Sequence, residues 1–595
     1  MTPAIKACQN CKREFTIEPE DFDFYKKIQV PPPTWCPECR MIRRMLFRNE
    51  CIWYRRKCDA TGKDILSMFS PEKPYKVYAN EYWKSDAWDP LMYGRSFNAT
   101  RPFLTQLNEL LHEVPHPNLV QKNMVNSEYA NYAVDLKNCY FVGGSTESED
   151  CAYIFGGTPR SRQCFDTFQT RDLESCYEAV DCEKSNGLRF SQNCTGCSDS
   201  YLLYDCRNCV SCVGCVGLRN KQFYIFNKSY SKEDYAKELL RLGLGTFRGL
   251  EEARKEFERL KLSVPRKFAN ILKSENVIGD DIVNAADCFH CFSTWNEIED
   301  LRYVYRAFDT VQDGMDAFVA WNNTELFYEV FSISGQRIFY SALIWGGFDI
   351  QYSYNCFDCN NIFGCVGLRN KSYCILNKQY SEQEYRELMP RIIAHMDEMK
   401  YADAKGRAYG YGEFFPPEFS PFTYNESVAQ DYFPKSPEQA IQEGFSWKEV
   451  DARQYTITKK REDIPDSIQS VDDSILKDVI ECAHVGSPTG GCHERCATAF
   501  RIVPQEFQFL KKMNIPLPRL CPICRRAERI RLRNPLRLWH RRCTCAGVTS
   551  ENKAHENTAP HFHGSGPCPN EFETSYAPER KEIVYCESCY NSEVV

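Results

Sequence analysis

Short runs of alternating hydrophobic and polar residues recur along the middle of the chain every 12 to 13 residues. They fill a first block over residues 129–230 and a second block over 296–359. Each period holds an aromatic or β-branched run and then a polar turn, which predicts one strand per period. A fixed short period favours a β-solenoid of stacked coils, with a β-meander as the alternative. The steps of the first block are marked by Cys139, Cys151, Cys164 and Cys176.

The two blocks are a duplication. Residues 215–235 and 365–385 are identical at 13 of 21 positions. Each block ends in a Tyr-Ser-x-x-acid-Tyr motif, in which Ser231 or Ser381 suits a helix N-cap followed by an acidic first turn. Amphipathic helices should therefore follow both blocks and cap them. The predicted helices cover residues 232–260 and 382–400.

The rest of the chain is less periodic. A β-hairpin and a helix near 101–113 are predicted before the first block. The Tyr-, Phe- and Pro-rich residues 401–475 indicate an extended linker on the surface, with a short helix within 436–450. The whole is mainly β with some α. In order, we expect a cysteine module (1–50), a connector (51–125), the first block (126–235), a helical insertion (236–280), the second block with its capping helix (281–400), the linker (401–475), a second cysteine module (476–535) and a C-terminal ribbon (536–595).

Composition is that of an ordinary globular protein except for 33 cysteines among 595 residues. No stretch approaches 18 apolar residues and the N-terminus lacks an apolar leader, so we expect a cytoplasmic protein without a membrane span. In that compartment thiols stay reduced, which favours metal ligands over disulfides. The net charge of −7 excludes a strongly basic nucleic-acid binder for the chain as a whole.

The first metal motif is a pair of C-x2-C turns near the N-terminus. Zinc prefers four soft ligands in a tetrahedron, and two such turns supply them. The second pair is flanked by prolines and followed by a helical pattern, which is typical of a treble clef or zinc ribbon. The predicted ligands are Cys8, Cys11, Cys36 and Cys39.

The module recurs near the other end of the chain. Residues 15–40 and 500–525 align without a gap and are identical at 13 of 26 positions. Three ligands follow from the alignment, namely Cys496, Cys521 and Cys524. For the fourth we favour Cys492 over the adjacent His493, and Cys482 and His484 are further candidates.

A third set of metal-binding residues follows the second module. Two cysteine pairs bracket a histidine-rich loop, and together they predict one more zinc ion. The favoured ligands are Cys543, Cys545, Cys586 and Cys589. In the alternative, Cys568, His561 or His563 replaces one of these or holds a second ion, or the histidines merely decorate a polar loop.

The two cysteine modules resemble a treble-clef zinc-binding family found in many bacterial proteins of unknown function. The shared features are the opening cysteine pair, a Phe-Tyr/Leu-Lys-Lys segment and the motif Pro-x-Pro-x-x-Cys-Pro-x-Cys-Arg. The resemblance covers roughly 35 residues at each end of the chain. It implies zinc binding and no established reaction.

Four cysteines of the first block are closely spaced. Their spacing, C-x2-C-x2-C-x2-C, approaches the ferredoxin run that binds an iron–sulfur cluster, but it lacks the final x3 spacing and proline. The second block has Ile362 at the third position, which indicates packing. An internal ladder of buried thiols is favoured over zinc, and zinc over a cluster. The residues are Cys206, Cys209, Cys212 and Cys215.

Arginines gather beside the two cysteine modules. Nine lie between Arg519 and Cys543 against a single acid, Glu528. Arginine forks match phosphate oxygens, so these helices could follow a nucleic-acid backbone. The alternative is a solvated helix face or pairing with acids elsewhere in the chain. The candidate nucleic-acid contacts are Arg40, Arg43, Arg44, Arg525, Arg526 and Arg529.

Together these features favour a multidomain scaffold with three zinc ions that docks RNA or DNA through its arginine-rich modules. One alternative is a protein-assembly scaffold that uses aromatic residues of the solenoid surface. Another is an enzyme with a site on the solenoid or in the histidine-rich segment. The chain contains no phosphate loop, GxGxxG, HExxH or GxSxG motif, so the balance leans against an enzyme. The oligomeric state is open.

Overall fold

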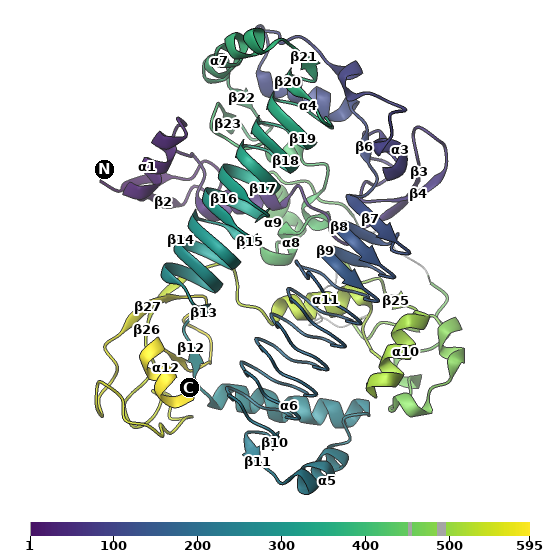
Figure 1. Cartoon of the computed structure of the whole chain (residues 1–595), viewed down its shortest axis with the longest axis vertical. Coiled ribbons are helices and arrows are strands. Elements are labelled where there is room, and N and C mark those ends of the chain that lie inside the picture. Colours follow the sequence, from purple (N-terminus) through teal and green to yellow (C-terminus); the bar gives the residue numbers. More distant parts are fainter. Residues whose placement is uncertain (1, 450–454, 485–494, 595) are drawn as a thin grey trace. The chain divides into compact units, whose positions relative to one another are not determined.

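The computed structural model describes residues 2–449, 455–484 and 495–594 and divides into two compact units (Figure 1). Both are mainly β with some helices, and none of the described strands closes into a barrel. Each unit combines one repeat block with a cysteine module from a distant part of the sequence. Unit 1 is Met1–Leu119 with Ala269–Lys448, and unit 2 is Val120–Phe268 with Glu449–Val595.

A nine-stranded sheet runs through the second block, in unit 1. Residues 13 apart lie opposite one another, as in the series Tyr305, Phe318 and Phe331, and the offset becomes 12 where Ala342 lies opposite Tyr354. Except for the last pair the strands are parallel, so a plain antiparallel meander does not describe the block. The strands are β13 (Ile271–Leu272), β14 (Glu275–Arg302), β15 (Tyr305–Phe308), β16 (Val311–Trp321), β17 (Thr324–Phe339), β18 (Ala342–Gln351), β19 (Tyr354–Phe363), β20 (Ser372–Ile375) and β21 (Lys378–Gln379).

The first block, in unit 2, stacks in the same parallel way. It opens with a three-stranded parallel sheet. Single parallel bridges then continue at 12-residue steps, for example from Phe165 to Tyr177, Arg189, Tyr201 and Val213. Successive turns of the chain therefore lie one on another in both blocks. The strands are β7 (Gln121–Val125), β8 (Ala130–Lys137) and β9 (Val142–Glu149), with the closing hairpin β10 (Tyr224–Ile225) and β11 (Lys228–Ser229).

Within each turn the backbone follows a three-residue pattern that the strand prediction missed. The middle residue of a triplet has a positive φ, as in Asp205 (50°), Asn208 (51°) and Gly214 (64°). Asn, Asp and Gly tolerate this left-handed region best, which explains their frequency in the blocks. The next residue of each triplet faces the interior, where cysteine, alanine and leucine pack together. Four triplets make one turn of 12 residues.

Helices follow the blocks where the capping residues predict them. Ser231 Oγ accepts a hydrogen bond from Asp234 N (3.1 Å) at the start of α5 (Lys232–Leu242). Ser381 caps α7 (Glu382–Glu398) in the same way. The helix expected over 232–260 is two helices, because Gly243 adopts a φ of 61° and ends α5 before α6 (Phe247–Ser263) begins.

The aromatic segment expected as a surface linker belongs in large part to the core of unit 1. Phe414, Phe415 and Tyr424 are fully buried, and the Phe414 ring lies 5.4 Å from that of Phe47. Burying these rings removes a large apolar area from water, which a surface path would leave exposed. The regular elements are β22 (Tyr401–Ala402), β23 (Ala408–Tyr409), α8 (Ala429–Tyr432) and α9 (Pro437–Gln442), the last lying within the expected 436–450.

The chain passes between the units three times, and the first two passages are equivalent. Helix α4 (Phe103–Glu113), expected near 101–113, belongs to unit 1 and leads into the first block in unit 2. Helix α6 belongs to unit 2 and leads into the second block in unit 1. A Val-Pro turn follows both helices, at Val114 and Val264. The duplication therefore includes the helix that precedes each block.

A buried histidine should make the stability of unit 1 depend on pH. His116 lies in β6 (His116–Pro117), where Nε2 is 2.7 Å from Leu111 O, and burial lowers its pKa to about 4. The unfolded chain takes up this proton near pH 6.5, so acidification favours unfolding. We expect the free energy of unfolding to fall by about 3 kcal/mol between pH 6.5 and pH 4 from this group.

Urea unfolding of the wild type and His116→Phe at pH 7 and pH 5 measures this contribution. The variant should lose less stability on acidification than the wild type. Equal losses in the two proteins would assign the pH dependence to other groups.

Candidate metal centres

The N-terminal module brings its four predicted ligands together. A hairpin of β1 (Ala4–Ala7) and β2 (Glu14–Ile17) carries one pair, and the start of α2 (Pro37–Met45) carries the other. All four sulfurs lie within 4.8 Å of one another, and Cys11 Sγ is 3.8 Å from Cys36 Sγ. Zinc with Zn–S bonds of about 2.3 Å gives tetrahedral S–S edges of about 3.8 Å. The group that could hold a metal ion is Cys8, Cys11, Cys36 and Cys39.

Hydrogen-bond donors surround these sulfurs. Cys36 N donates to Cys8 Sγ (3.2 Å), and Asn10 Nδ2 donates to Cys39 Sγ (3.4 Å). Hydrogen bonds from the Cys36 and Cys39 thiols hold the pKa of Cys8 below its ordinary value. Such contacts favour the thiolate form, which is the form that binds a metal.

Among the described residues, the second module brings four cysteines together, namely Cys482, Cys496, Cys521 and Cys524. Cys482 Sγ lies 3.6 Å from Cys524 Sγ, and Cys496 Sγ lies 4.0 Å from Cys521 Sγ. Cys492 and His493 lie outside the described residues. His484 is described and lies near Glu528 (3.6 Å), outside the ligand group.

A second hairpin explains the choice of Cys482. Strand β24 (Ile480–Glu481) pairs with β25 (Ala499–Phe500) as β1 pairs with β2, and each first strand ends directly before a cysteine. In the sequence alone, the close spacing of Cys492 and Cys496 favours a local C-x3-C pair. The usable signal was the short apolar strand before Cys482, which resembles the strand before Cys8.

The C-terminal ribbon gathers the alternative set, in which Cys568 replaces one of the favoured ligands. Cys568 takes the place of Cys545, with its Sγ 3.9 Å from Cys586 Sγ and 3.7 Å from Cys589 Sγ. Residues two apart, such as Cys543 and Cys545, point to the same side only on a regular strand. Strand β26 (Trp539–Arg542) ends before Cys543, so these two side chains do not have to face the same ion. The first group in this ribbon is Cys543, Cys568, Cys586 and Cys589.

Cys545 belongs to a second group of candidate metal ligands in the same ribbon. Its Sγ lies 3.7 Å from His561 Nδ1. The histidine-rich loop is therefore a candidate ligand source, which was one of the alternatives for this segment. The four residues of the second group are Cys545, His561, His563 and Cys589.

Residues 54–84 have the architecture of the C-terminal ribbon without its ligands. Strands β3 (Tyr54–Lys57) and β4 (Asp64–Ser67) pair as β26 pairs with β27 (Glu571–Thr574). Helix α3 (Asn80–Lys84) follows β5 (Val77–Tyr78) as α12 (Glu587–Val594) follows β28 (Val584–Tyr585). Among described residues this first ribbon forms no group of three or more metal ligands.

Arginines on α2 attach the N-terminal module to the second block. Arg40, Arg43 and Arg44 are at most 1% exposed. Arg40 Nη2 lies 2.8 Å from Asp316 Oδ2, and Arg43 and Arg44 contact the two oxygens of Glu329 at 2.7 and 2.8 Å. Burial alone would raise the pKa of Glu329, but the arginines hold it below its ordinary value. These side chains are closed to solvent, so the prediction that they contact nucleic acid is wrong.

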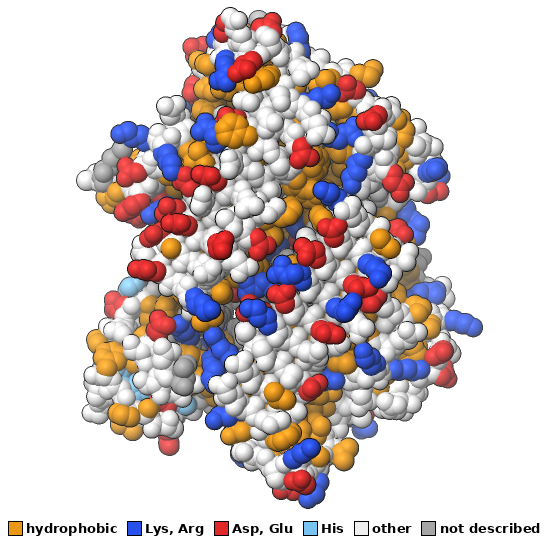
Figure 2. Space-filling model, in the orientation of Figure 1, with side chains coloured by type: hydrophobic (Ala, Val, Ile, Leu, Met, Phe, Trp, Pro, Cys, Tyr) orange, Lys and Arg blue, Asp and Glu red, His pale blue; other side chains and the backbone are white. Residues whose placement is uncertain are grey.

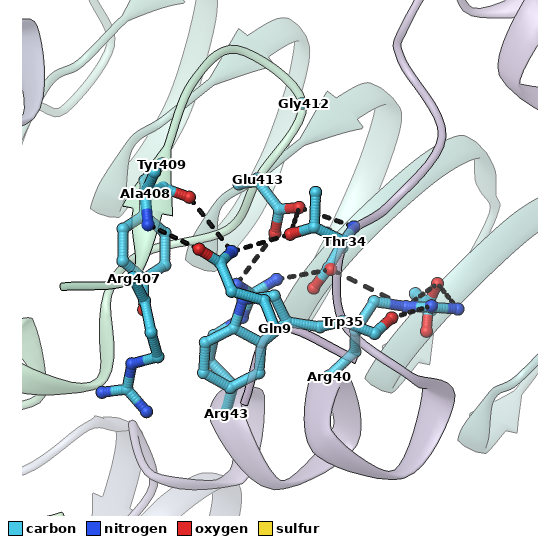
Figure 3. Close-up of polar contacts among 12 residues, drawn as sticks. Gln9, Thr34, Trp35, Arg40, Arg43, Arg407, Ala408, Tyr409, Gly412 and Glu413 are labelled. Carbon is cyan, nitrogen blue, oxygen red and sulfur yellow. Dashed lines mark hydrogen bonds and ion pairs between the residues drawn. The ribbon is translucent and has the colours of Figure 1, made fainter. Parts of the chain in front are cut away.

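Further contacts attach the same module to residues 407–413 (Figure 3). Thr34 Oγ1 donates to Glu413 Oε1 (2.6 Å), and Arg43 Nη1 lies 3.0 Å from Glu413 Oε2. Gln9 exchanges two hydrogen bonds with the backbone of Ala408. The segment expected as a linker therefore helps to hold the metal module in place.

The second module repeats this attachment in unit 2. On α11 (Pro522–Arg531), Arg525 and Arg529 contact Asp166 at 2.6 and 2.7 Å, and Arg526 lies over the Phe155 ring. The three arginines are at most 3% exposed. Arg525 also pairs with a buried acid of α10 (Pro504–Met513). The predicted nucleic-acid contacts of Arg525, Arg526 and Arg529 are wrong for the same reason.

Each arginine of the basic stretch between Arg519 and Cys543 has a contact within the chain, although the side chains of Arg531 and Arg542 are 46% and 64% exposed. Besides the three buried arginines of α11, the other six each contact a carboxylate, a main-chain carbonyl or an aromatic ring. The alternatives for this stretch are a solvated helix face and pairing with acids elsewhere in the chain. The arrangement favours these alternatives over a phosphate-binding surface.

The four closely spaced cysteines of the first block face the interior of the stack. All are buried, and their thiols donate to main-chain carbonyls, as Cys209 does to Arg207 O and Leu218 O (3.5 and 3.4 Å). Among described residues they form no ligand group. Their spacing follows from the three-residue repeat, in which each of these cysteines is the inward-facing residue of a different triplet. The set is Cys206, Cys209, Cys212 and Cys215.

Comparisons with known proteins identify no family. No family model matches the chain, and no curated protein matches it. A structure from Desulfovibrio desulfuricans G20, whose title assigns it provisionally to the acetyltransferases, is 10% identical over 48% of this chain and 85% of its own, with a TM-score of 0.11. A TM-score this low carries no argument about fold or function. Within the described residues, no helix is both long and apolar enough to span a membrane.

Proposed function

We propose that the protein is a metal-clamped binding scaffold built on a duplicated β-solenoid. Parallel stacking at 12 to 13 residues supports the solenoid, and groups of four protein ligands support zinc in a structural role. In this proposal the ions fold the treble-clef modules, and the modules hold their arginines against buried carboxylates of the blocks. The clamped blocks then present a rigid surface to a partner.

The observation that carries the proposal is an aromatic row on the second block. Its members, Phe308, Trp321, Trp345 and Phe357, are all partly exposed. Neighbouring ring centroids lie 6.3, 6.0 and 5.4 Å apart along the row. Stacked turns place these positions above one another, since Phe308 lies opposite Trp321 and Trp345 opposite Phe357. The fold therefore lines up rings that are distant in sequence.

The surroundings of the aromatic row favour a protein partner over a nucleic acid. Exposed Asp309 and Asp358 follow Phe308 and Phe357 and would repel phosphates. Phe348, three residues after Trp345, is 40% exposed, and the Arg337 guanidinium lies 6.0 Å from its ring centroid. On the face drawn in Figure 2, acidic and basic side chains are interspersed. Tryptophan and phenylalanine are enriched at protein interfaces, where they fill desolvated pockets. The proposed occupant is an apolar segment of a protein.

Photo-cross-linking from the position of Phe348 tests this surface. With p-benzoylphenylalanine there, we expect a discrete adduct that is sensitive to protease and resistant to nuclease. Adding Trp321→Ala and Trp345→Ala should lower its yield at least about tenfold, because central aromatic residues dominate interface energies.

A cross-linker at exposed Leu240 in the other unit serves as the control. The same adduct from both positions, or an adduct indifferent to the tryptophan changes, would contradict the proposal. The purified protein should also bind labelled RNA and DNA weakly, with little dependence on salt. A steep negative slope of log affinity against log salt would restore a nucleic-acid function.

A further inference from the structure

We infer that the C-terminal ribbon holds a binuclear metal cluster in which Cys589 Sγ bridges two ions. The inference is independent of the proposed partner. Two groups of four ligand atoms occur in this ribbon, and they share one residue, Cys589. Within each group all ligand atoms lie within 4.8 Å of one another. Two adjacent tetrahedra that share a thiolate corner satisfy both groups, giving an S4 site and an S2N2 site.

The distances fit the edges of two zinc tetrahedra. In the S4 group, Cys568 Sγ is 3.7 Å from Cys589 Sγ, close to the S–S edge of about 3.8 Å. In the S2N2 group, Cys545 Sγ is 3.7 Å from His561 Nδ1, and His563 Nε2 is 3.3 Å from Cys589 Sγ. Zn–N bonds of about 2.05 Å give an S–N edge of about 3.5 Å, between these two values.

Both imidazole rings are oriented as metal ligands. His561 Nε2 lies 3.1 Å from Glu593 Oε1, and His563 Nδ1 lies 2.8 Å from Gly566 O. A carboxylate or a carbonyl oxygen only accepts, so in the neutral ring these nitrogens carry the proton. The other nitrogen of each ring then turns its lone pair toward a sulfur of the group. Metal-bound histidines are held in this way by an acceptor on the far nitrogen.

The acceptor of His561 is itself fixed. Glu593 is 1% exposed at its side chain, and it accepts hydrogen bonds from Thr558 N (2.8 Å) and Ala559 N (3.0 Å). It also lies 3.3 Å from His555 Nε2. A carboxylate with this many donors cannot turn away, so the ring of His561 keeps its orientation. The third histidine of the loop thus supports the site without being a ligand.

Charge also favours two ions over one. Five cysteines converge on the ribbon, and one divalent ion would leave most of the charge of five thiolates uncompensated. Two divalent ions reduce the net charge of the thiolates to −1. Side-chain amides offset part of the remainder, since Asn557 Nδ2 donates to Cys545 Sγ (3.3 Å) and Asn570 Nδ2 to Cys586 Sγ (3.4 Å). Tetrahedral S4 and S2N2 sets are typical of zinc and of iron–sulfur sites, and we propose zinc because the distances fit its bond lengths.

Native mass spectrometry of the zinc-loaded chain gives a first test. With one ion in each treble-clef module, the wild type should carry four ions and His563→Ala should carry three. His540→Ala is the matched control and should keep four, because His540 is exposed, pairs with Glu571 and Glu573, and belongs to no ligand group of the described residues. Three ions in the wild type, or four in His563→Ala, would overturn the second site.

The bridge itself has a separate readout. After exchange with ¹¹³Cd, a shared thiolate should give two cadmium resonances with a mutual scalar coupling, and His563→Ala should remove the coupling. His563→Cys guards against a folding defect, because it preserves four ligands and should retain both ions with a shifted resonance. Uncoupled resonances in a fully loaded wild type would overturn the bridge. None of these results depends on the aromatic row.

Discussion

Glu329→Ala is expected to destabilise unit 1 by about 3–5 kcal/mol. The Glu329 side chain is fully buried, and its two oxygens contact Arg43 and Arg44. Alanine would leave these guanidinium groups in the interior without their main counter-charge. Breaking one side of a buried ion pair costs that much because the remaining charge cannot regain its hydration.

Urea unfolding followed by tryptophan fluorescence at constant free zinc measures the effect. Glu299→Ala is the matched control, since Glu299 lies exposed on the same block, and it should change stability by less than about 0.5 kcal/mol. Indistinguishable midpoints for the two variants would mean that the arginine network does not hold the module. Metal content measured on the same samples separates loss of the ion from loss of the ion pairs.

Metal binding and the arginine network are linked through one helix. Cys36 is the N-cap of α2, Cys39 lies in its first turn, and Arg40, Arg43 and Arg44 follow directly. A metal ion bound by these cysteines would therefore fix the start of the helix that carries the arginines. Cys521 and α11 have the same relation in unit 2. The same arrangement, a helix that starts at candidate metal ligands and continues into buried arginines, thus occurs in both units. In each it joins segments that lie far apart in sequence.

The sequence was informative wherever a local rule dictates the structure. The C-x2-C pairs predict the N-terminal ligands because the geometry of each pair is set within four residues. The 12- to 13-residue period predicts stacking because equivalent positions must share an environment. The three-residue pattern was missed because it is a pattern of backbone conformation and not of hydrophobicity. It consists of a positive φ at every third residue, such as Asp205 and Asn208.

Other features depend on partners that local sequence does not reveal. Arg40 pairs with Asp316, 276 residues away, and nothing around Arg40 distinguishes a buried ion pair from a phosphate-binding side chain. Cys482 joins a group that could hold a metal ion because the pairing of β24 with β25 brings it close to Cys496. Nearness in sequence favours Cys492 instead, which lies outside the described residues, so that prediction stays open.

The two ribbons provide an internal comparison of metal binding. Cys58 and Cys543 each follow the first strand of a ribbon, and each sulfur accepts an N–H from the residue after a later strand. Ala79 N donates to Cys58 Sγ (3.3 Å), and Cys586 N donates to Cys543 Sγ (3.2 Å). The first ribbon has Ala79 where the second has a cysteine ligand. Cys543 thus belongs to a group of four candidate ligands, whereas Cys58 belongs to no such group among the described residues.

Cys543→Ser should therefore remove at least one bound ion and unfold the C-terminal ribbon, whereas Cys58→Ser should leave the metal content unchanged. Metal binding supplies about 10–16 kcal/mol to small zinc domains, so a lost ligand removes much of the ribbon's stability. Native mass spectrometry counts the ions, and limited proteolysis should cut the ribbon after Cys543→Ser alone. Cys58→Ser controls for the loss of a buried thiol in the same setting. Equal ion counts in the two variants would show that the cysteines of the second ribbon only pack.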